Sequence, residues 1–162
     1  MAETYDTAAL PDRMTQFVPH AAAVGMTMVS IEPGKGVMKV DWREDLVGDP
    51  ETGVIASGIV TALIDHTCGL AVNSAAKTPM PIATLDLRID HLRPAAPRLG
   101  VTVEAVCYRL TRSIGFVRDT CFETSIHAVV EHGMPKVAEE VEDFGRGGMW
   151  YAFGSERPGV AS

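Results

Sequence analysis

One aspartate interrupts the apolar segment "ASGIVTALIDHTCGLA", which spans residues 56–71. Aspartate is a poor residue for the interior of a helix and is rarely buried without a partner, so Asp65 needs an explanation. Two explanations are open at this point: Asp65 belongs to a chemical site, or it is buried and caps a neighbouring backbone group. Gly58 lies seven residues earlier, close to two helical turns, so the two positions share a helix face roughly 10 Å apart along the axis.

The start of the same helix offers a second chemical group. The first amides of a helix have no acceptor within it and lie at the positive end of its dipole, so they suit an oxygen that becomes negative in a transition state. Ser57 and Gly58 supply such amides from the backbone. Asp65 is too distant to act there within one chain, but a second helix running the other way would bring the groups together. The spacing is therefore compatible with a site shared by two subunits.

The elements that must hold these groups begin with two helices and a hairpin. Hydrophobic periodicity and turn residues predict, in chain order, a helix over 11–24 that Pro19 must bend or interrupt, a hairpin over 26–42 that turns at 33–36, a loop over 43–56, and a long helix over 57–76 with Ser57 as its N-cap. Apolar residues cover almost the full circumference of the long helix, so other elements must surround it.

After residue 81 the hydrophobic period changes to two. A half-buried strand is predicted over 82–93, with Ala83, Leu85, Leu87 and Ile89 facing inward and Thr84, Asp86, Arg88 and Asp90 facing outward. Three more strands are predicted over 100–111, 115–126 and 135–145, followed by an irregular tail over 146–162. Strands with such short connections are antiparallel, and a lone apolar helix is wrapped by the sheet available to it.

These elements predict an α+β fold in which an antiparallel sheet wraps around a long central helix. A length of 162 residues favours a single domain, here 1–162 with its core at about 19–145. The net charge of −7 argues against an extended nucleic-acid surface and against an anionic membrane as partner. An odd count of three cysteines without a CxxC pair, and the lack of a signal-peptide pattern, favour a reduced, cytoplasmic protein.

Three segments carry a resemblance to a known family: "GDPETGVIASGIVTALIDHTCGLAV", "PIATLDLRIDHLRPA" and "CYRLTRSIGFVRDTCFE". Over roughly residues 19–144 the sequence resembles the hotdog-fold acyl-CoA thioesterases of the phenylacetyl-CoA type, within the 4-hydroxybenzoyl-CoA thioesterase superfamily. The resemblance implies hydrolysis of an acyl-CoA to free acid and CoA, with no cofactor beyond the CoA moiety of the substrate. It also implies a homodimer or a dimer of dimers (a homotetramer), with the site at the dimer interface.

The family pattern can be compared position by position at the helix start. In the family, a helix carboxylate is the base or nucleophile, and Asp65 matches it. The helix usually begins with His-Gly-Gly after a loop that contains Asn. Here Gly58 matches the second glycine, Ser57 replaces the first, Ala56 replaces the histidine and Asp49 replaces the loop asparagine. The backbone donors are thus kept, whereas two side chains are lost.

Other residues of the resembling segments are candidates for the same site. Thr84 stands where the family often has a hydroxyl that positions the water, although the strand pattern places it on the outer side with Asp86. Arginine binds phosphate through its planar fork, and CoA carries a 3′-phosphate and a diphosphate. Arg93 in "LRPA", and Arg112 with Ser113 in "LTRSIG", are therefore candidate CoA-binding residues; a structural or solvated arginine is the alternative.

Two histidines receive structural interpretations. His66 is expected to face a neighbouring element or the dimer contact, and His91 to be a satisfied core or interface histidine. Neither is paired with a cysteine at the spacing of metal ligands, so no metal is expected. Two alternatives to a thioesterase stay open: an acyl-CoA-binding protein with little or no turnover, and a hydratase or dehydratase, which would usually pair a histidine with an acidic residue.

Overall fold

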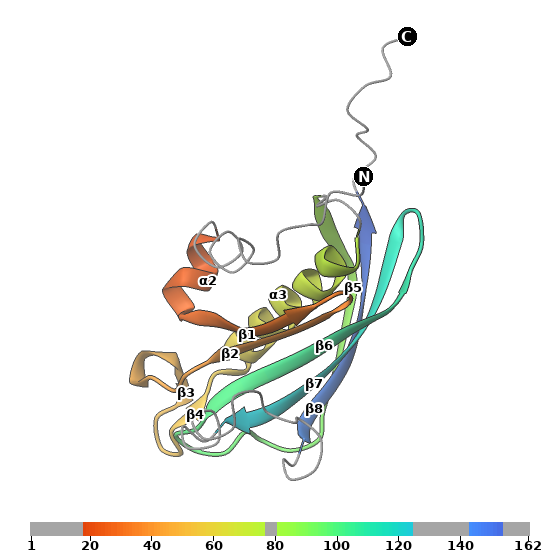
Figure 1. Cartoon of the computed structure of the whole chain (residues 1–162). Coiled ribbons are helices and arrows are strands. Elements are labelled where there is room, and N and C mark those ends of the chain that lie inside the picture. The colour runs from red at the N-terminus through yellow and green to blue at the C-terminus, as the bar shows by residue number, and fades with distance from the viewer. Residues whose placement is uncertain (1–17, 77–80, 125–142, 154–162) are drawn as a thin grey trace.

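A computed structural model of the chain describes residues 18–76, 81–124 and 143–153. A six-stranded antiparallel sheet curls around one long helix, α3, which spans Ser57–Ala75 (Figure 1). The predicted α+β architecture is therefore confirmed. The buried apolar side chains form one cluster between the helix and the concave face of the sheet, with Leu63, Ile64, Leu70 and Val72 among the most buried.

The short helix α2 covers Pro19–Val24, and residues 11–17 of the predicted helix lie outside the described part. Pro19 is the first residue of this helix, so the described helix begins at the position where a bend or interruption was predicted; the part of the prediction before residue 18 lies outside the described residues. Proline suits that position because its fixed φ is helical and the amide it lacks would have no acceptor there.

The predicted hairpin is confirmed as β1 (Met26–Glu32) and β2 (Lys35–Val40). Its turn is shorter than expected, because Lys35 and Gly36 already belong to β2. Gly34 has φ +80°, which favours glycine; its carbonyl accepts the Cys107 amide at 2.8 Å and its amide donates to Ser74 Oγ at 3.1 Å. The turn is thereby held against β6 and the end of α3.

The predicted loop over 43–56 contains regular structure that the sequence pattern missed. It forms a 3-10 turn, η2 (Glu44–Leu46), and a small two-stranded sheet of β3 (Val47–Asp49) and β4 (Val54–Ile55). Gly48 allows this sheet to lie against the helix start, since a Cβ there would come within 2.7 Å of the Ala56 Cα atom. The second strand of this small sheet leads directly into α3.

Helix α3 matches the predicted range, but its cap differs. Ala56 is the N-cap residue, with extended ψ and no side-chain hydrogen bond, and Ser57 is the first helical residue, so the prediction of Ser57 as N-cap is wrong by one position. The helix is also not enclosed on all sides, because Gly58 and Asp65 are exposed in the single chain. The interpretation of Asp65 as a buried capping residue is therefore contradicted.

The main sheet is completed by β5 (Ile82–His91), β6 (Gly100–Leu110), β7 (Ile114–Thr124) and β8 (Asp143–Phe153), in the order β1-β2-β6-β7-β8-β5. The predicted strands agree with β5, β6 and β7 within about two residues. Most of the predicted strand over 135–145 lies outside the described part, and residues 146–153, expected to be an irregular tail, belong to β8. Backbone pairing with both β5 and β7 supports this strand despite its glycines.

A β-bulge in β5 changes which of its side chains face the helix. The register with β8 shifts between Thr84 and Asp86. Before the bulge, Ile82 and Thr84 face the helix; after it, Leu87 and Ile89 do. The prediction that Ala83 and Leu85 face inward and Thr84 outward is therefore wrong, because the extra residue of a bulge exchanges the two faces of a strand.

Candidate active site

A cavity of about 480 Å³ opens at the start of α3. Its walls come from the β3–β4 sheet, the first turn of the helix, the end of β5 and the segment that follows β5. Four of the predicted site residues line it: Asp49, Ala56, Ser57 and Arg93. The volume lies within the range of natural small-molecule sites, so this cavity could hold part of a ligand of that size.

Backbone amide donors lie at the N-terminal end of α3. Within the described helix, the first amide with an acceptor is that of Ile59, which donates to the Ala56 carbonyl at 2.9 Å. The Ser57 and Gly58 amides therefore precede the hydrogen-bonded part of the helix. The space above Gly58 is open, because a Cβ added there would meet no atom of the described chain within 4 Å. A ligand oxygen could therefore approach these amides.

Asp49 lies in the cavity wall, but its carboxylate is engaged in its own turn. One oxygen accepts the Thr52 hydroxyl at 2.8 Å and the other accepts the Glu51 amide at 3.1 Å. The hydrogen bond from Thr52, followed by that from Glu51, lowers the pKa of Asp49. Asp49 therefore remains an acceptor at neutral pH and cannot donate as the amide of an asparagine would.

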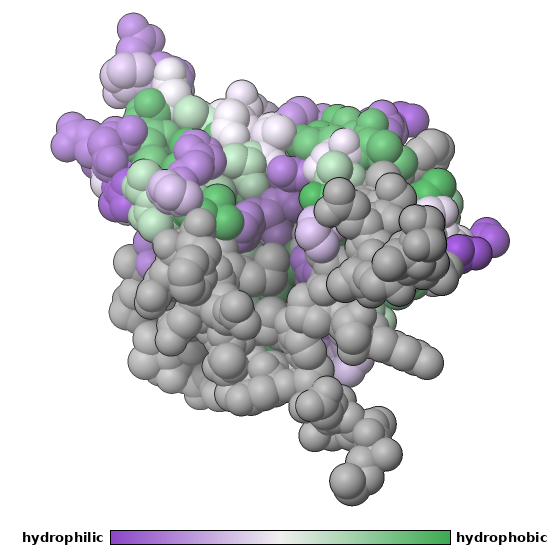
Figure 2. Space-filling model, turned by 90° about the horizontal axis from the view of Figure 1, so that it is seen from above, coloured by the Kyte–Doolittle hydropathy of each residue, from purple (hydrophilic) through white to green (hydrophobic). Residues whose placement is uncertain are grey.

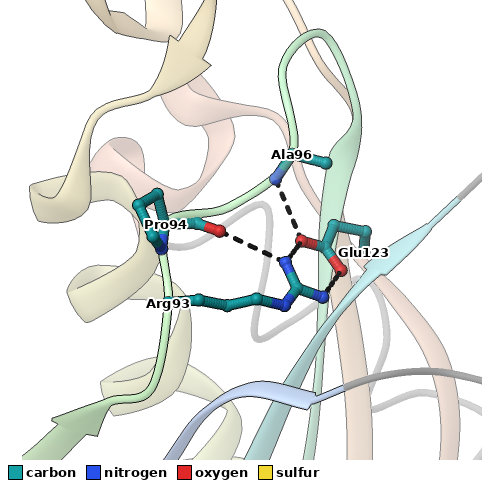
Figure 3. Close-up of polar contacts among 4 residues, drawn as sticks. All are labelled: Arg93, Pro94, Ala96 and Glu123. Carbon is teal, nitrogen blue, oxygen red and sulfur yellow. Dashed lines mark hydrogen bonds and ion pairs between the residues drawn. The ribbon is translucent and has the colours of Figure 1, made fainter.

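Arg93 also lines the cavity, where it forms a forked ion pair with Glu123 (Figure 3). Its Nη2 donates to Glu123 Oε2 at 2.8 Å, and Nη1 contacts the other carboxylate oxygen and the Pro94 carbonyl. The Ala96 amide donates to Glu123 at 2.9 Å. Burial raises the pKa of Glu123, but the hydrogen bonds from Arg93 and Ala96 outweigh it and the net shift is downward. Arg93 thus links the cavity wall to β7. This agrees with the alternative interpretation of Arg93 as a structural residue.

Asp65 and Thr84 meet outside the cavity. The Thr84 hydroxyl donates to Asp65 Oδ1 at 2.7 Å, and both residues are exposed in the single chain. The β5 bulge makes this contact possible, because it turns Thr84 toward the helix. The structure therefore joins these two predicted residues to each other, but keeps them apart from the residues of the cavity.

Arg112 and Ser113 lie far from the cavity within one chain. They form the turn between β6 and β7, at the other end of the sheet from β3 and β4 (Figure 1). This turn is near the end of α3, since a Cβ on Gly115 would lie 3.1 Å from Val72. A contact of Arg112 or Ser113 with a ligand in the same chain's cavity is not supported by this placement.

Comparisons with known proteins agree with this architecture. A family model described as the thioesterase superfamily matches residues 52–121, which include the start of α3, Asp65 and Thr84. A solved structure of a Pseudomonas aeruginosa protein is 25% identical, with a TM-score of 0.70 over 88% of this chain and 98% of that one. The chain has the hotdog fold, and over residues 52–121 it is similar to the thioesterase superfamily.

Two further similar proteins bear names that suggest chemistry. PaaI, from the phenylacetic acid degradation operon of E. coli, shares its fold with a TM-score of 0.70 at 15% identity, over 90% of this chain and 92% of PaaI. A provisionally named esterase of Halobacterium salinarum is 32% identical over 95 residues, which are 57% of this chain and 62% of that relative. The chain thus aligns with less than two thirds of the length of this esterase.

His91 is a cavity residue that the sequence interpretation missed. It is the last residue of β5, is exposed, and lines the cavity together with Ala56 and Ser57. Its exposure contradicts the core position that was one of its two expected roles, whereas the other, a place at an interface, stays a prediction. Its position two residues before Arg93, a predicted site residue, could have indicated that His91 lies near the same site.

Asp119 was also missed by the sequence interpretation, and it lies in the core. It is only 3% exposed; Oδ2 accepts the Cys68 thiol at 3.8 Å, and Oδ1 has no hydrogen-bond partner among the described residues. Burial raises its pKa to about 6, and the Cys68 hydrogen bond only partly opposes the rise. The alternation of Val117, Asp119 and Cys121 along β7 could have shown that it faces inward.

Metal and membrane sites can be assessed within the described residues only. There, no three His, Cys, Asp or Glu side chains gather in a way that could hold a metal ion. The helices described include none with the length and hydropathy needed to cross a membrane. The three cysteines, Cys68, Cys107 and Cys121, are free thiols.

Proposed function

We propose that this protein is an acyl-CoA thioesterase, which hydrolyses an acyl-CoA to free acid and CoA without any further cofactor. One observation carries the proposal: a single chain holds, in two separate places, groups that could serve as the two halves of a hydrolytic site. A cavity with amide donors lies at the start of α3, and a carboxylate held by Thr84 lies two turns further along the same helix. The similarity of residues 52–121 to the thioesterase superfamily supports a thioester as the substrate.

The cavity half would bind and polarise the thioester. Its carbonyl oxygen would accept the Ser57 and Gly58 amides, which stabilise the negative charge that develops when the carbonyl carbon becomes tetrahedral. Removing one such donor in other enzymes costs about 3–4 kcal/mol of transition-state stabilisation. The Ser57 substitution for glycine keeps this donor, because the amide belongs to the backbone.

The carboxylate half would come from a second copy of the chain. Asp65 is roughly 12 Å along the helix axis from Ser57, too far to act at its own helix start. Asp65 of a second, antiparallel helix would instead reach the carbonyl, where it would activate a water or attack directly. The hydroxyl of Thr84 would hold this carboxylate in its orientation.

The surface around β5 supports a second copy as partner. Within the described chain β5 pairs only with β8, so its other edge presents backbone groups that can pair with another strand. Leu85 and Leu92 beside this edge are 56% and 60% exposed. The space-filling view also shows apolar patches among polar residues on one face (Figure 2). We therefore expect a homodimer, or a dimer of dimers.

Purified protein and a panel of acyl-CoAs test this function through release of the CoA thiol. We expect hydrolysis by the wild-type protein and a loss of kcat of about 10²–10⁴-fold in Asp65→Asn, the range for removing a general base. Asp86→Asn is the matched control, since Asp86 is an exposed carboxylate on the same strand as Thr84. Hydrolysis at the wild-type rate by Asp65→Asn would refute the assignment of Asp65.

A second candidate function is acyl-CoA binding with little turnover. It is favoured by Ala56, which has no polar side chain at the N-cap, and by Asp49, whose carboxylate is held in its turn. Calorimetry separates the two functions: tight binding of CoA or an acyl-CoA by wild-type protein that releases no thiol would support the binding protein.

A further inference from the structure

The polar groups of the cavity leave few side chains that could donate a hydrogen bond to a substrate. Ala56 contributes only a methyl group, the carboxylate of Asp49 can only accept, and the fork of Arg93 holds Glu123. Among the described residues that line the cavity, the remaining side-chain donors are the Ser57 hydroxyl and the His91 imidazole. Within the described part of the chain, the imidazole has no hydrogen bond or ion pair.

The β5 bulge explains why this imidazole lies in the cavity. Thr84 and His91 are seven residues apart, so a regular strand would place them on opposite faces of the sheet. The additional residue at the bulge turns both of them toward α3. One strand thereby supplies Thr84 to the carboxylate and His91 to the cavity at the helix start.

We propose that His91 is a catalytic residue that donates a hydrogen bond to the thioester carbonyl oxygen, alongside the Ser57 and Gly58 amides. The proposal rests on the thioesterase function proposed above. An imidazole from the end of β5 would then take the place of the side chain that Ala56 lacks at the N-cap. It would make this chain a full hydrolase despite the missing helix-start histidine.

The chemical step balances without a net proton transfer at His91. When the partner's Asp65 acts as a base, it accepts a proton from water, whose oxygen bonds to the carbonyl carbon. The π electrons of the carbonyl move to its oxygen, where the two amides and the imidazole stabilise the charge. When the carbonyl re-forms, the C–S bond breaks and the electron pair leaves with the CoA sulfur. The sulfur then takes up the proton that Asp65 accepted, which regenerates the carboxylate.

Steady-state kinetics of substituted proteins test this role. We expect His91→Ala to lower kcat by about 100-fold, as for loss of one oxyanion donor, while KM changes by less than about threefold. His91→Gln should recover part of the lost rate, because its amide can also donate. His20→Ala is the control, since His20 is an exposed histidine on α2, and it should leave both constants unchanged.

The substitution Ala56→His provides a second, independent test of the role of His91. In the His91→Ala background it should raise kcat by about tenfold or more, because a donor returns to the carbonyl. In the wild-type background the gain should be much smaller, since that donor is already present. Equal gains in the two backgrounds would overturn the proposal, because donors to the same oxygen should not act independently.

Two further outcomes would overturn the proposed role of His91, and they distinguish its failure from the failure of the proposed thioesterase function. If wild-type protein hydrolyses acyl-CoA and Asp65→Asn abolishes this, but His91→Ala keeps the wild-type kcat or changes only KM, the role of His91 alone is refuted. If wild-type protein releases no thiol from any acyl-CoA, the proposed function is refuted and the role of His91 with it.

Discussion

At the scale of single residues, Asp119 is a carboxyl group in an environment unfavourable to its charge. It is buried between α3 and the sheet, and burial raises its pKa to about 6. In the unfolded chain an aspartate has a pKa of about 3.9, so the folded protein binds this proton more tightly. Asp119 therefore contributes stability below about pH 4, and that contribution is lost as the pH rises through about 6.

Asp119→Asn should remove this pH dependence. A shift of about two pKa units corresponds to about 3 kcal/mol, so the variant should unfold close to wild type near pH 4 and be up to that much more stable at pH 8. Urea unfolding at the two pH values measures the difference. The exposed Asp86→Asn control should retain the wild-type dependence. A variant that loses stability between pH 4 and pH 8 as steeply as wild type would contradict this account.

At the scale of elements, the start of α3 combines open space with unbonded amides. A methyl group on Gly58 would meet no described atom of the chain, and alanine favours a helix over glycine by up to about 1 kcal/mol. Gly58→Ala should therefore keep or raise the melting temperature. The amide also remains in place, so a lower kcat/KM would report contact of the methyl group with the thioester or with a second copy.

Thermal unfolding and thiol release, measured on the same samples, test Gly58→Ala. We expect stability at or above that of wild type together with at least a severalfold lower kcat/KM. Gly48→Ala is the contrasting variant, because its methyl group would lie 2.7 Å from the Ala56 Cα atom and should destabilise the fold itself. Full activity in Gly58→Ala would show that neither ligand nor partner approaches this position.

At the scale of the whole molecule, the separation of Asp65 from the cavity means that the proposed site needs two chains. Ser57→Pro deletes one amide yet suits the first helical position, since Ala56 has the extended ψ that precedes proline. Asp65→Asn and Ser57→Pro should each be nearly inactive alone. Co-expressed, they should regain about one quarter of wild-type activity, because half the dimers are mixed and each holds one intact site of two.

Light scattering should show a dimer for each variant and for the mixture. A mixture that is no more active than the mean of the two separate variants would refute the shared site. A monomer that hydrolyses acyl-CoA would refute it as well, because no single chain brings Asp65 to its own helix start.

Local sequence patterns determined much of this protein. The apolar helix, its Gly58–Asp65 spacing, the β1–β2 hairpin and the strands β5 to β7 all follow from periodicity and turn residues within a few positions. These features depend on neighbours in the chain, so they can be recognised before any packing is known.

Only the tertiary structure decided where the chemistry gathers. Residues 146–153 form β8 because two distant strands pair with them, and the bulge in that pairing turns Thr84 to Asp65 and leaves His91 in the cavity. Arg93, a candidate for phosphate, instead holds Glu123 thirty residues away. Each of these outcomes depends on pairing between segments far apart in the sequence, where a shift of one residue exchanges the faces of a strand and leaves no local trace.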